Sequence, residues 1–298
     1  MFTRKSPSTG ARSPEVTGFY EADTGSIQYV VADPGTKKAA LIDVVLDFDP
    51  ASAKTGTESA QEILDFVKRE GLEVEWVLDT HPHADHMMAS SWLVEQTGAP
   101  NAIGEKVKEI AHLWADLYNM PGVFDPESDF SRLFADGDTF KIGDLDVRVM
   151  LSPGHTLGSI TYVVGDAAFV HDTFMHVDVG TSRADFPGGS SSVLYDSLQR
   201  ILELPDETRL FIGHDYPPVD NREDPAWEAT VAEHREKNPH VGGGASREDY
   251  VKLRDERDAT LGLPDRMLYA LQVNLRAGQL PEAEADGNSY FKIPANKF

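Results

Sequence analysis

A short loop of the sequence, residues 80–86, contains His81, His83, Asp85 and His86. Imidazole nitrogens bind zinc, iron, copper and nickel, and a carboxylate adds negative charge that balances the charge of the ion. A lone histidine is usually a surface or capping residue, but so dense a group of ligand-type side chains is typical of neither. The loop therefore predicts a transition-metal site, and it leaves the identity of the metal open.

Three further ligand-type residues, His155, Asp172 and His214, lie later in the chain, each just after a short apolar run. His155 is part of a Gly-rich turn, residues 152–158. Apolar runs of this length are typical of buried strands. In α/β proteins, ligands bind outside the carboxyl ends of such strands. We therefore expect these three side chains to meet the loop at residues 80–86 at one edge of a sheet.

The elements expected around the loop support this arrangement. Residues 75–79 predict a buried strand before it, and residues 89–96 predict a helix after it, closed by Gly98. The runs 26–32 and 38–46 predict a hairpin, because Asp-Pro-Gly at residues 33–35 is a strong turn signal.

The segment Ser59-Ala60-Gln61-Glu62 matches a capping box. In such a box the first and last side chains bond each other's backbone amides. We therefore expect a helix to begin at Ser59.

The whole set of residues resembles the ligand pattern of the metallo-β-lactamase superfamily. The positions that match that pattern, in order, are His81, His83, Asp85, His86, His155, Asp172 and His214. The resemblance implies a four-layer αβ/βα sandwich, a fold of the α/β class, with the metal site at one edge.

Within that superfamily the chain is most similar to the persulfide dioxygenases, also called sulfur dioxygenases. The segments Arg-Ala-Asp-Phe at 183–186 and His-Asp-Tyr at 214–216 carry this resemblance. Two positions depart from the family: Pro82 stands where members often have Cys, and His171 stands where they have a small residue. Neither departure removes a ligand, but His171 or the nearby His176 could orient a metal ligand through a hydrogen bond.

The resemblance implies one Fe(II) per chain, held at the catalytic centre by His81, His155 and Asp172. Two histidines and one carboxylate leave one face of the ion open for substrate sulfur and dioxygen. The implied reaction oxidises glutathione persulfide with O2 to sulfite and glutathione. The remaining ligand-type residues would surround this ion or hold a second metal with Asp172 as the bridge; they are His83, Asp85, His86 and His214.

The main alternative is a dinuclear hydrolase of the glyoxalase II type, which cleaves glutathione thioesters. It would use the same residues with two zinc or iron ions and activate a hydroxide between them. The residues alone do not separate one metal from two. The larger glutathione-binding helical region of glyoxalase II is not recognised after His214. A scaffold without activity is disfavoured, because every ligand position is filled.

Glutathione carries two carboxylates, and a guanidinium meets a carboxylate with two parallel hydrogen bonds. Arg183, in a loop that follows Asp172, is the first candidate for binding the substrate. Tyr216 and Arg276 are further candidates.

Composition limits the remaining choices. The chain has 298 residues, 40% of them hydrophobic, which is enough for one large domain. Its formal net charge of -23 argues against nucleic acid, which needs a basic surface. The chain has 0 Cys, which excludes disulfides and thiolate ligands. With no apolar run long enough for a membrane span and no secretory signal, we expect a cytoplasmic protein without a membrane partner.

We expect a polar tail at residues 1–15, a catalytic domain at 16–217 and a helical extension at 218–298 packed against it. The extension could form a wall of the substrate pocket or a contact between the subunits of a homo-oligomer.

Overall fold

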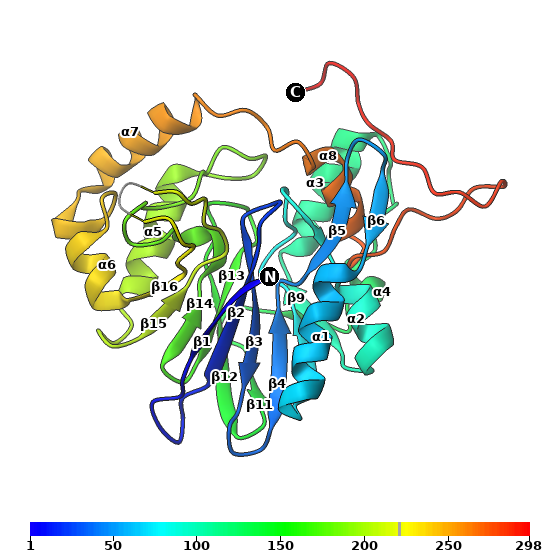
Figure 1. Ribbon diagram of the computed structural model, residues 1–298. Coiled ribbons are helices and arrows are strands. Elements are labelled where there is room, and N and C mark those ends of the chain that lie inside the picture. Colours follow the sequence, from blue (N-terminus) through cyan, green and yellow to red (C-terminus); the bar gives the residue numbers. More distant parts are fainter. Residues whose placement is uncertain (220–221) are drawn as a thin grey trace.

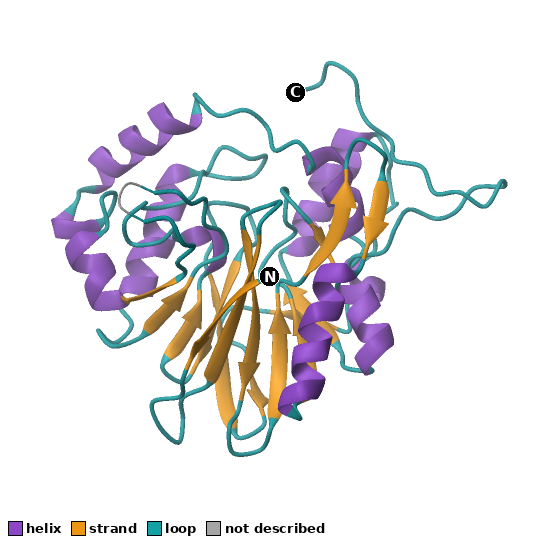
Figure 2. Cartoon of the chain, viewed as in Figure 1, coloured by secondary structure: helices purple, strands orange, loops and turns teal. Residues whose placement is uncertain are grey.

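The computed structural model describes residues 1–219 and 222–298, and its strands form two large mixed sheets (Figure 1). The first sheet has the order β1-β2-β3-β4-β7-β9-β10 and the second β11-β12-β13-β14-β15-β16. Figure 2 shows the strands in the middle of the molecule with helices on both sides. The α/β sandwich expected from the sequence is therefore confirmed.

The strands of the first sheet are β1 (Phe2–Ser6), β2 (Glu15–Glu21), β3 (Ser26–Ala32), β4 (Lys38–Ile42), β7 (Glu73–Leu78), β9 (Asn101–Gly104) and β10 (Arg132–Phe134). Those of the second are β11 (Thr139–Ile142), β12 (Leu145–Leu151), β13 (Ile160–Val164), β14 (Ala167–Phe169), β15 (Arg209–Phe211) and β16 (Glu228–Thr230). A small third sheet contains β5 (Val45–Asp49), β6 (Lys54–Gly56) and β8 (Met87–Met88).

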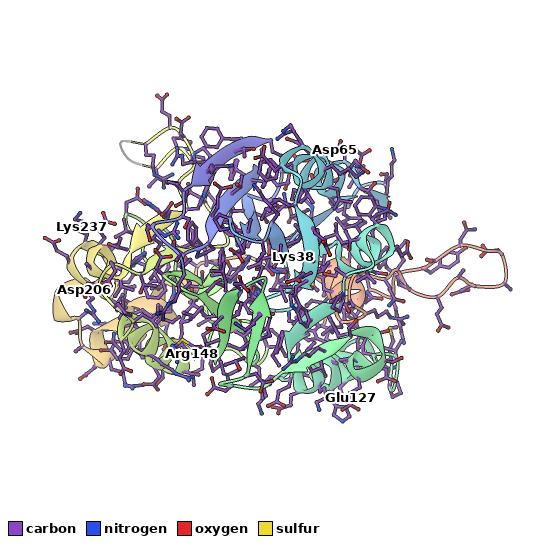
Figure 3. All side chains as sticks on the ribbon, turned by 90° about the horizontal axis from the view of Figure 1, so that it is seen from below. Lys38, Asp65, Glu127, Arg148, Asp206 and Lys237 are labelled. Carbon is purple, nitrogen blue, oxygen red and sulfur yellow. The ribbon has the colours of Figure 1, made fainter. Side chains whose placement is uncertain are left out.

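The helices of the first half are α1 (Glu58–Glu70), α2 (Ser90–Thr97), α3 (Val107–Tyr118) and α4 (Pro126–Asp129). Those of the second half are α5 (Ser191–Leu202), α6 (Val231–Lys237), α7 (Arg247–Asp258) and α8 (Met267–Asn274), with short 3-10 turns at η1 (His171–Thr173) and η2 (Gly242–Gly244). Charged side chains of the helices point outward, among them Asp65, Glu127 and Lys237 (Figure 3). No helix in the described ranges has both the length and the apolar character needed to cross a membrane.

The main core lies between the two sheets. Tyr29 and Ile42 of the first sheet belong to one buried cluster with Val149 and Tyr162 of the second. Leu198 of α5 joins the same cluster. Each fully buried apolar side chain of this size contributes about 1.5–3 kcal/mol relative to an exposed one, so this interface fixes how the two sheets face each other.

The strands that precede the metal-ligand candidates are aligned. β4 and β7 are parallel, β7 and β9 are parallel, and β14 and β15 are parallel. β12 runs the same way as β14, because each is antiparallel to β13. Within each sheet, the carboxyl ends of these strands therefore lie at one edge. The edges of the two sheets meet where His81, after β7, lies 3.6 Å from Asp172, after β14, and this is the edge predicted to hold the metal.

The hairpin expected at 26–32 and 38–46 is confirmed in part. β3 and β4 pair antiparallel, but β4 ends at Ile42, because Asp43 adopts a positive φ of 52° and turns the chain. Val45 and the residues after it then pair with β6 and β8 instead.

The expected capping box is not formed. Helix α1 begins at Glu58, and neither Thr57 nor Ser59 caps it through a side chain. The helix after the metal-binding loop is confirmed as α2, and Gly98 closes it in the left-handed conformation.

The ends of the chain differ from the expected tail and extension in their details. Residues 1–15, expected as a polar tail, contain β1, which pairs antiparallel with β2 at the edge of the first sheet. The expected extension, 218–298, contains β16 as well as helices α6 to α8. Asp220 and Asn221 of that extension lie outside the described residues.

Candidate metal centre

Three ligand candidates face one point from three different elements. His81 Nε2 lies 3.6 Å from Asp172 Oδ2, and His155 Nε2 lies 3.5 Å from the same oxygen. His81 follows β7, His155 follows β12, and Asp172 lies in η1 after β14. All three are buried. His81 Nε2 has no hydrogen-bond partner among the described residues, although it is buried.

Hydrogen bonds fix which nitrogen of each histidine is free. His155 Nδ1 lies 2.8 Å from the carbonyl oxygen of Arg183, so Nδ1 carries the hydrogen and Nε2 keeps its lone pair. The Thr80 hydroxyl donates to Asp43 Oδ2 at 2.9 Å. Its oxygen is therefore left to accept from His81 Nδ1, 3.1 Å away. Both Nε2 atoms are thus prepared to bind a metal.

Asp43 anchors the metal-binding loop at residues 80–86 through hydrogen bonds. Its carboxylate accepts from the backbone N–H of Thr80 at 2.8 Å as well as from the Thr80 hydroxyl. It also lies 3.0 Å from His83 Nε2. His83 is therefore turned toward Asp43, and this bond explains why Asp43 is fully buried without being a ligand itself.

The remaining candidates form a second group beside the first. His214 Nδ1 lies 2.6 Å from Asp172 Oδ1, and its Nε2 lies 2.6 Å from Asp85 Oδ2. Asp85, Asp172 and His214 bring ligand atoms within 4.8 Å of one another, which is close enough to hold an ion. His86 lies next to this group, and its buried Nε2 has no partner in the described part of the chain.

Burial and neighbouring charges set protonation states that suit a metal. Burial, with His83 and His155 close by, holds the pKa of His81 well below its usual value. Burial would raise the pKa of Asp172, but His214 and His171 hold it well below its usual value. Because metals bind neutral imidazole and ionised carboxylate, these residues are in the required states at neutral pH.

His171 is the unusual member of this centre. Its Nε2 lies 3.1 Å from Asp43 Oδ2, and its Nδ1 lies 3.3 Å from Asp172 Oδ1. The residue has a φ of 38°, and its ring lies so close to Gly213 that a Cβ there would overlap it. His171 therefore lies between the loop-anchoring Asp43 and the ligand candidate Asp172. His176, in contrast, bonds Asp178 at 2.7 Å.

Asn274 is a supporting residue that the sequence did not indicate. Its side chain, on α8, donates to the carbonyl oxygens of His83 and His86, both at 2.8 Å. Its Oδ1 accepts from the backbone N–H of Met88 at 2.8 Å. Helix α8 is thus fastened to the loop that carries the metal-ligand candidates. A polar residue in an apolar helix was the available signal, but it does not name its partner.

A cavity of about 590 Å³ opens onto the metal centre. His155, Asp172 and His214 line its inner end, and α7 supplies its far wall through Leu253, Arg254 and Arg257. Met175, Val179 and Phe186 add apolar surface. The Phe186 ring meets the His155 ring edge to face at 5.3 Å. The centre is therefore reached through a partly apolar pocket.

Two of the three substrate-binding candidates line this cavity. Tyr216 does so with its ring stacked beside His214. Arg183 does so too, but its guanidinium is bonded to both oxygens of Asp185 and to the carbonyl oxygen of Gly262. Arg276 is not among the lining residues and lies beside Phe124.

The arrangement fits a transition metal. The donor set is imidazole and carboxylate, the Nε2 atoms are freed by bonds to Nδ1, and a buried nitrogen of His81 lacks any partner in the described ranges. Such a set suits iron or zinc and does not choose between them.

Comparison with known proteins indicates the same superfamily as the ligand pattern does. A model of the Metallo-beta-lactamase superfamily matches residues 23–214. The chain is 54% identical over 285 residues to a beta-lactamase hydrolase-like protein of Xylella fastidiosa, covering 96% of this chain and 65% of that protein. It is 40% identical over 281 residues to glyoxylase B2 of Dictyostelium discoideum, covering 93% and 96% of the two chains.

More distant matches carry a different name. The chain is 28% identical over 268 residues to the human mitochondrial persulfide dioxygenase ETHE1, covering 89% of each. The crystal structure of ETHE1 from Myxococcus xanthus superimposes with a TM-score of 0.70 at 29% identity, covering 94% of this chain and 100% of that one.

Proposed function

Because this chain belongs to the metallo-beta-lactamase superfamily, we propose that its metal centre holds one Fe(II) and that the protein oxidises a persulfide with O2. The substrate would be glutathione persulfide. One O2 and one water would convert it to glutathione and sulfite with release of two protons. The terminal sulfur is oxidised, its bond to the glutathione sulfur breaks, and O2 is reduced.

The carboxylate of Asp172 carries this proposal. One of its oxygens faces His81 and His155, and the other is bonded to His214. His214 in turn uses its second nitrogen on Asp85. The first group is therefore open to an ion, while two members of the second group are already paired with each other. This difference favours one metal over two.

Each residue of the first group has a defined part. His81 and His155 would hold the ion through Nε2, and Asp172 through Oδ2. An Fe(II) ion held in this way supplies a redox-active centre with open positions. His214 keeps Asp172 oriented, and Phe186 with the apolar residues beside it limits the access of water to the inner end of the cavity.

A metal-dependent thioester hydrolase is the second candidate. It is favoured by the 40% identity to a protein named glyoxylase B2 and by the Nε2 of His86, which lies beside Asp85 and His214 without a partner in the described ranges. Two ions held by these residues and by the first group would activate a hydroxide. The chain spans only 65% of the length of the beta-lactamase hydrolase-like protein of Xylella fastidiosa. A hydrolase activity of that whole protein is therefore extended to this chain only as a proposal.

The test compares both reactions on one preparation of defined metal content. Protein loaded anaerobically with Fe(II) is mixed with glutathione persulfide, and oxygen uptake and sulfite are measured. We expect uptake matched by sulfite, no uptake from zinc-loaded protein, and none from Asp172→Ala. Hydrolysis of S-lactoylglutathione by protein with two metals per chain, without oxygen uptake by the Fe(II) form, would establish the hydrolase instead.

A further inference from the structure

The far wall of the cavity carries a cation that has no carboxylate partner in the described ranges. Arg254 and Arg257 are one turn apart on α7, and both line the cavity. Arg254 is buried and bonded to Asp258 and to the carbonyl oxygen of Thr181. Arg257 is exposed, and no carboxylate of residues 1–219 or 222–298 lies within ion-pair distance of its guanidinium.

His240 stands beside this cation as a neutral hydrogen-bond donor. Its Nδ1 accepts from the backbone N–H of Thr181 at 3.0 Å, so the hydrogen of the neutral ring must be on Nε2. Burial and the charges of Arg254 and Arg257 lower the pKa of His240 to about 4, which keeps the ring neutral at physiological pH. The ring also lies against Gly180, where a Cβ would overlap it, so its position is fixed.

The other charges that line the cavity are balanced. Asp85 and Asp172, at the inner end, are both bonded to His214. Arg183 is paired with Asp185, and Arg254 with Asp258. The far wall formed by α7 is therefore the part of the cavity with an unbalanced positive charge, which would attract an anionic group of a ligand.

The size of the cavity points to a ligand larger than a bare persulfide. A volume of about 590 Å³ lies within the range of sites that enclose molecules of the size of a small peptide. Leu253, Leu261 and Pro264 line the same cavity as Arg257 and offer apolar contact to the body of such a ligand.

We propose that Arg257 and His240 form a carboxylate-binding subsite at the α7 end of the cavity, which selects a peptide-like thiol carrier whose sulfur reaches the metal centre. This assignment rests on the proposed function for the identity of the reacting sulfur. It concerns binding, however, and can be tested without turnover. Guanidinium and the Nε2–H donor of His240 would share the two carboxylate oxygens.

The test is calorimetric titration of the metal-loaded protein with S-methylglutathione, whose capped sulfur cannot react as a persulfide. We expect Arg257→Gln to weaken binding about tenfold, as loss of one charge-assisted contact does. Lys252→Gln is the matched control, because it removes the same charge from the same helix at an exposed position that does not line the cavity. Arg257→Lys keeps the charge but loses the planar fork, so its affinity should lie between wild type and Arg257→Gln.

A second ligand shows whether the carboxylate is the group recognised. S-methylglutathione diethyl ester lacks the carboxylate charges, so it should bind the wild type about tenfold more weakly than S-methylglutathione does. Its affinity should not fall further in Arg257→Gln. Equal affinities of wild type, Arg257→Gln and Lys252→Gln for S-methylglutathione would overturn the subsite. An Arg257→Gln effect confined to S-methyl coenzyme A would overturn it too, by assigning the site to phosphate.

The outcomes separate this subsite from the reaction. Oxygen uptake by an enzyme whose Arg257→Gln variant binds S-methylglutathione normally would refute the subsite and leave the dioxygenase intact. Weakened binding of S-methylglutathione in Arg257→Gln, with no oxygen uptake by the wild type, would support the subsite and refute the dioxygenase. In an active enzyme, Arg257→Gln should raise KM about tenfold and leave kcat within about twofold, because the contact is distant from the reacting sulfur.

Discussion

Replacing Asp43 by Asn should weaken metal binding without moving the backbone. Asp43 adopts a φ of 52°, a conformation that Asn also tolerates. The remaining amide oxygen can still accept from the Thr80 N–H and from His83. The new NH2 group, however, replaces the oxygen that accepts from the Thr80 hydroxyl at 2.9 Å. A donor thus stands where an acceptor is needed.

The hydroxyl of Thr80 must then reverse. If it accepts from the introduced amide, its own hydrogen points toward His81 Nδ1, 3.1 Å away, and favours the tautomer with hydrogen on Nε2. That hydrogen occupies the lone pair that would bind the metal. Changes in such supporting bonds typically lower metal affinity by about 10–100-fold. Loss of charge-assisted bonds should also lower the free energy of unfolding of the metal-free protein by about 2–4 kcal/mol.

The control is Asp33→Asn, in the turn between β3 and β4. Asp33 also accepts three hydrogen bonds, from the N–H groups of Gly35 and Asp144 and from the Thr36 hydroxyl. It should lose stability but bind metal as the wild type does. Denaturant unfolding of metal-free protein and competition with a chelator measure the two effects separately. If Asp43→Asn loses stability and keeps wild-type metal affinity, the role given to the Thr80 hydroxyl is wrong.

Three other substitutions test the supporting structure. Asn274→Ala should lower both metal affinity in chelator competition and the free energy of unfolding, the latter by about 2–4 kcal/mol, because it leaves the carbonyl oxygens of His83 and His86 and the N–H of Met88 without their partner; an unchanged affinity would separate α8 from the metal loop. Asp79→Asn should change the unfolding free energy by less than about 1 kcal/mol, since burial, with the charge of Asp43, raises the pKa of Asp79 well above its usual value and favours the protonated form, which Asn resembles; a large loss in denaturant unfolding would show that Asp79 is ionised. Burial, with a smaller effect of His176, lowers the pKa of His234 to about 4, whereas the unfolded chain has about 6.5. The unfolded state therefore binds more protons between these values, and stability should fall by up to about 3 kcal/mol as the pH falls from about 6.5 to about 4. His234→Phe should remove that part of the slope of unfolding free energy against pH, and an identical slope in the variant would refute it.

Local sequence patterns are enough to predict that the metal-ligand candidates lie close together. Each of them follows a strand, and parallel strands place their carboxyl ends at one edge, so His81, His155 and Asp172 meet although they are far apart in the chain. The limits of single elements do not follow from these patterns. β4 stops at Ile42 because Asp43 turns the chain to reach Thr80, a contact that alternation of apolar residues does not reveal.

Contacts between distant segments account for what the sequence did not indicate. Asn274 supports a loop 191 residues earlier than itself. Arg183 lines the cavity as its position suggested, but Asp185 two residues later pairs with its guanidinium. Arg257 lies in the extension that was expected to form a pocket wall or a subunit contact, but no pattern in its charged helix distinguishes it from the neighbouring charges. Its place in the cavity wall depends on how α7 packs against α5, which no local pattern specifies.

The most direct measurement of the proposed chemistry is the ratio of oxygen consumed to glutathione persulfide added, with iron content determined on the same sample. We predict one O2 per persulfide, one sulfite formed, and a rate proportional to iron up to one Fe(II) per chain. Persulfide left unchanged in the presence of O2 by protein that contains one Fe(II) per chain would contradict a dioxygenase.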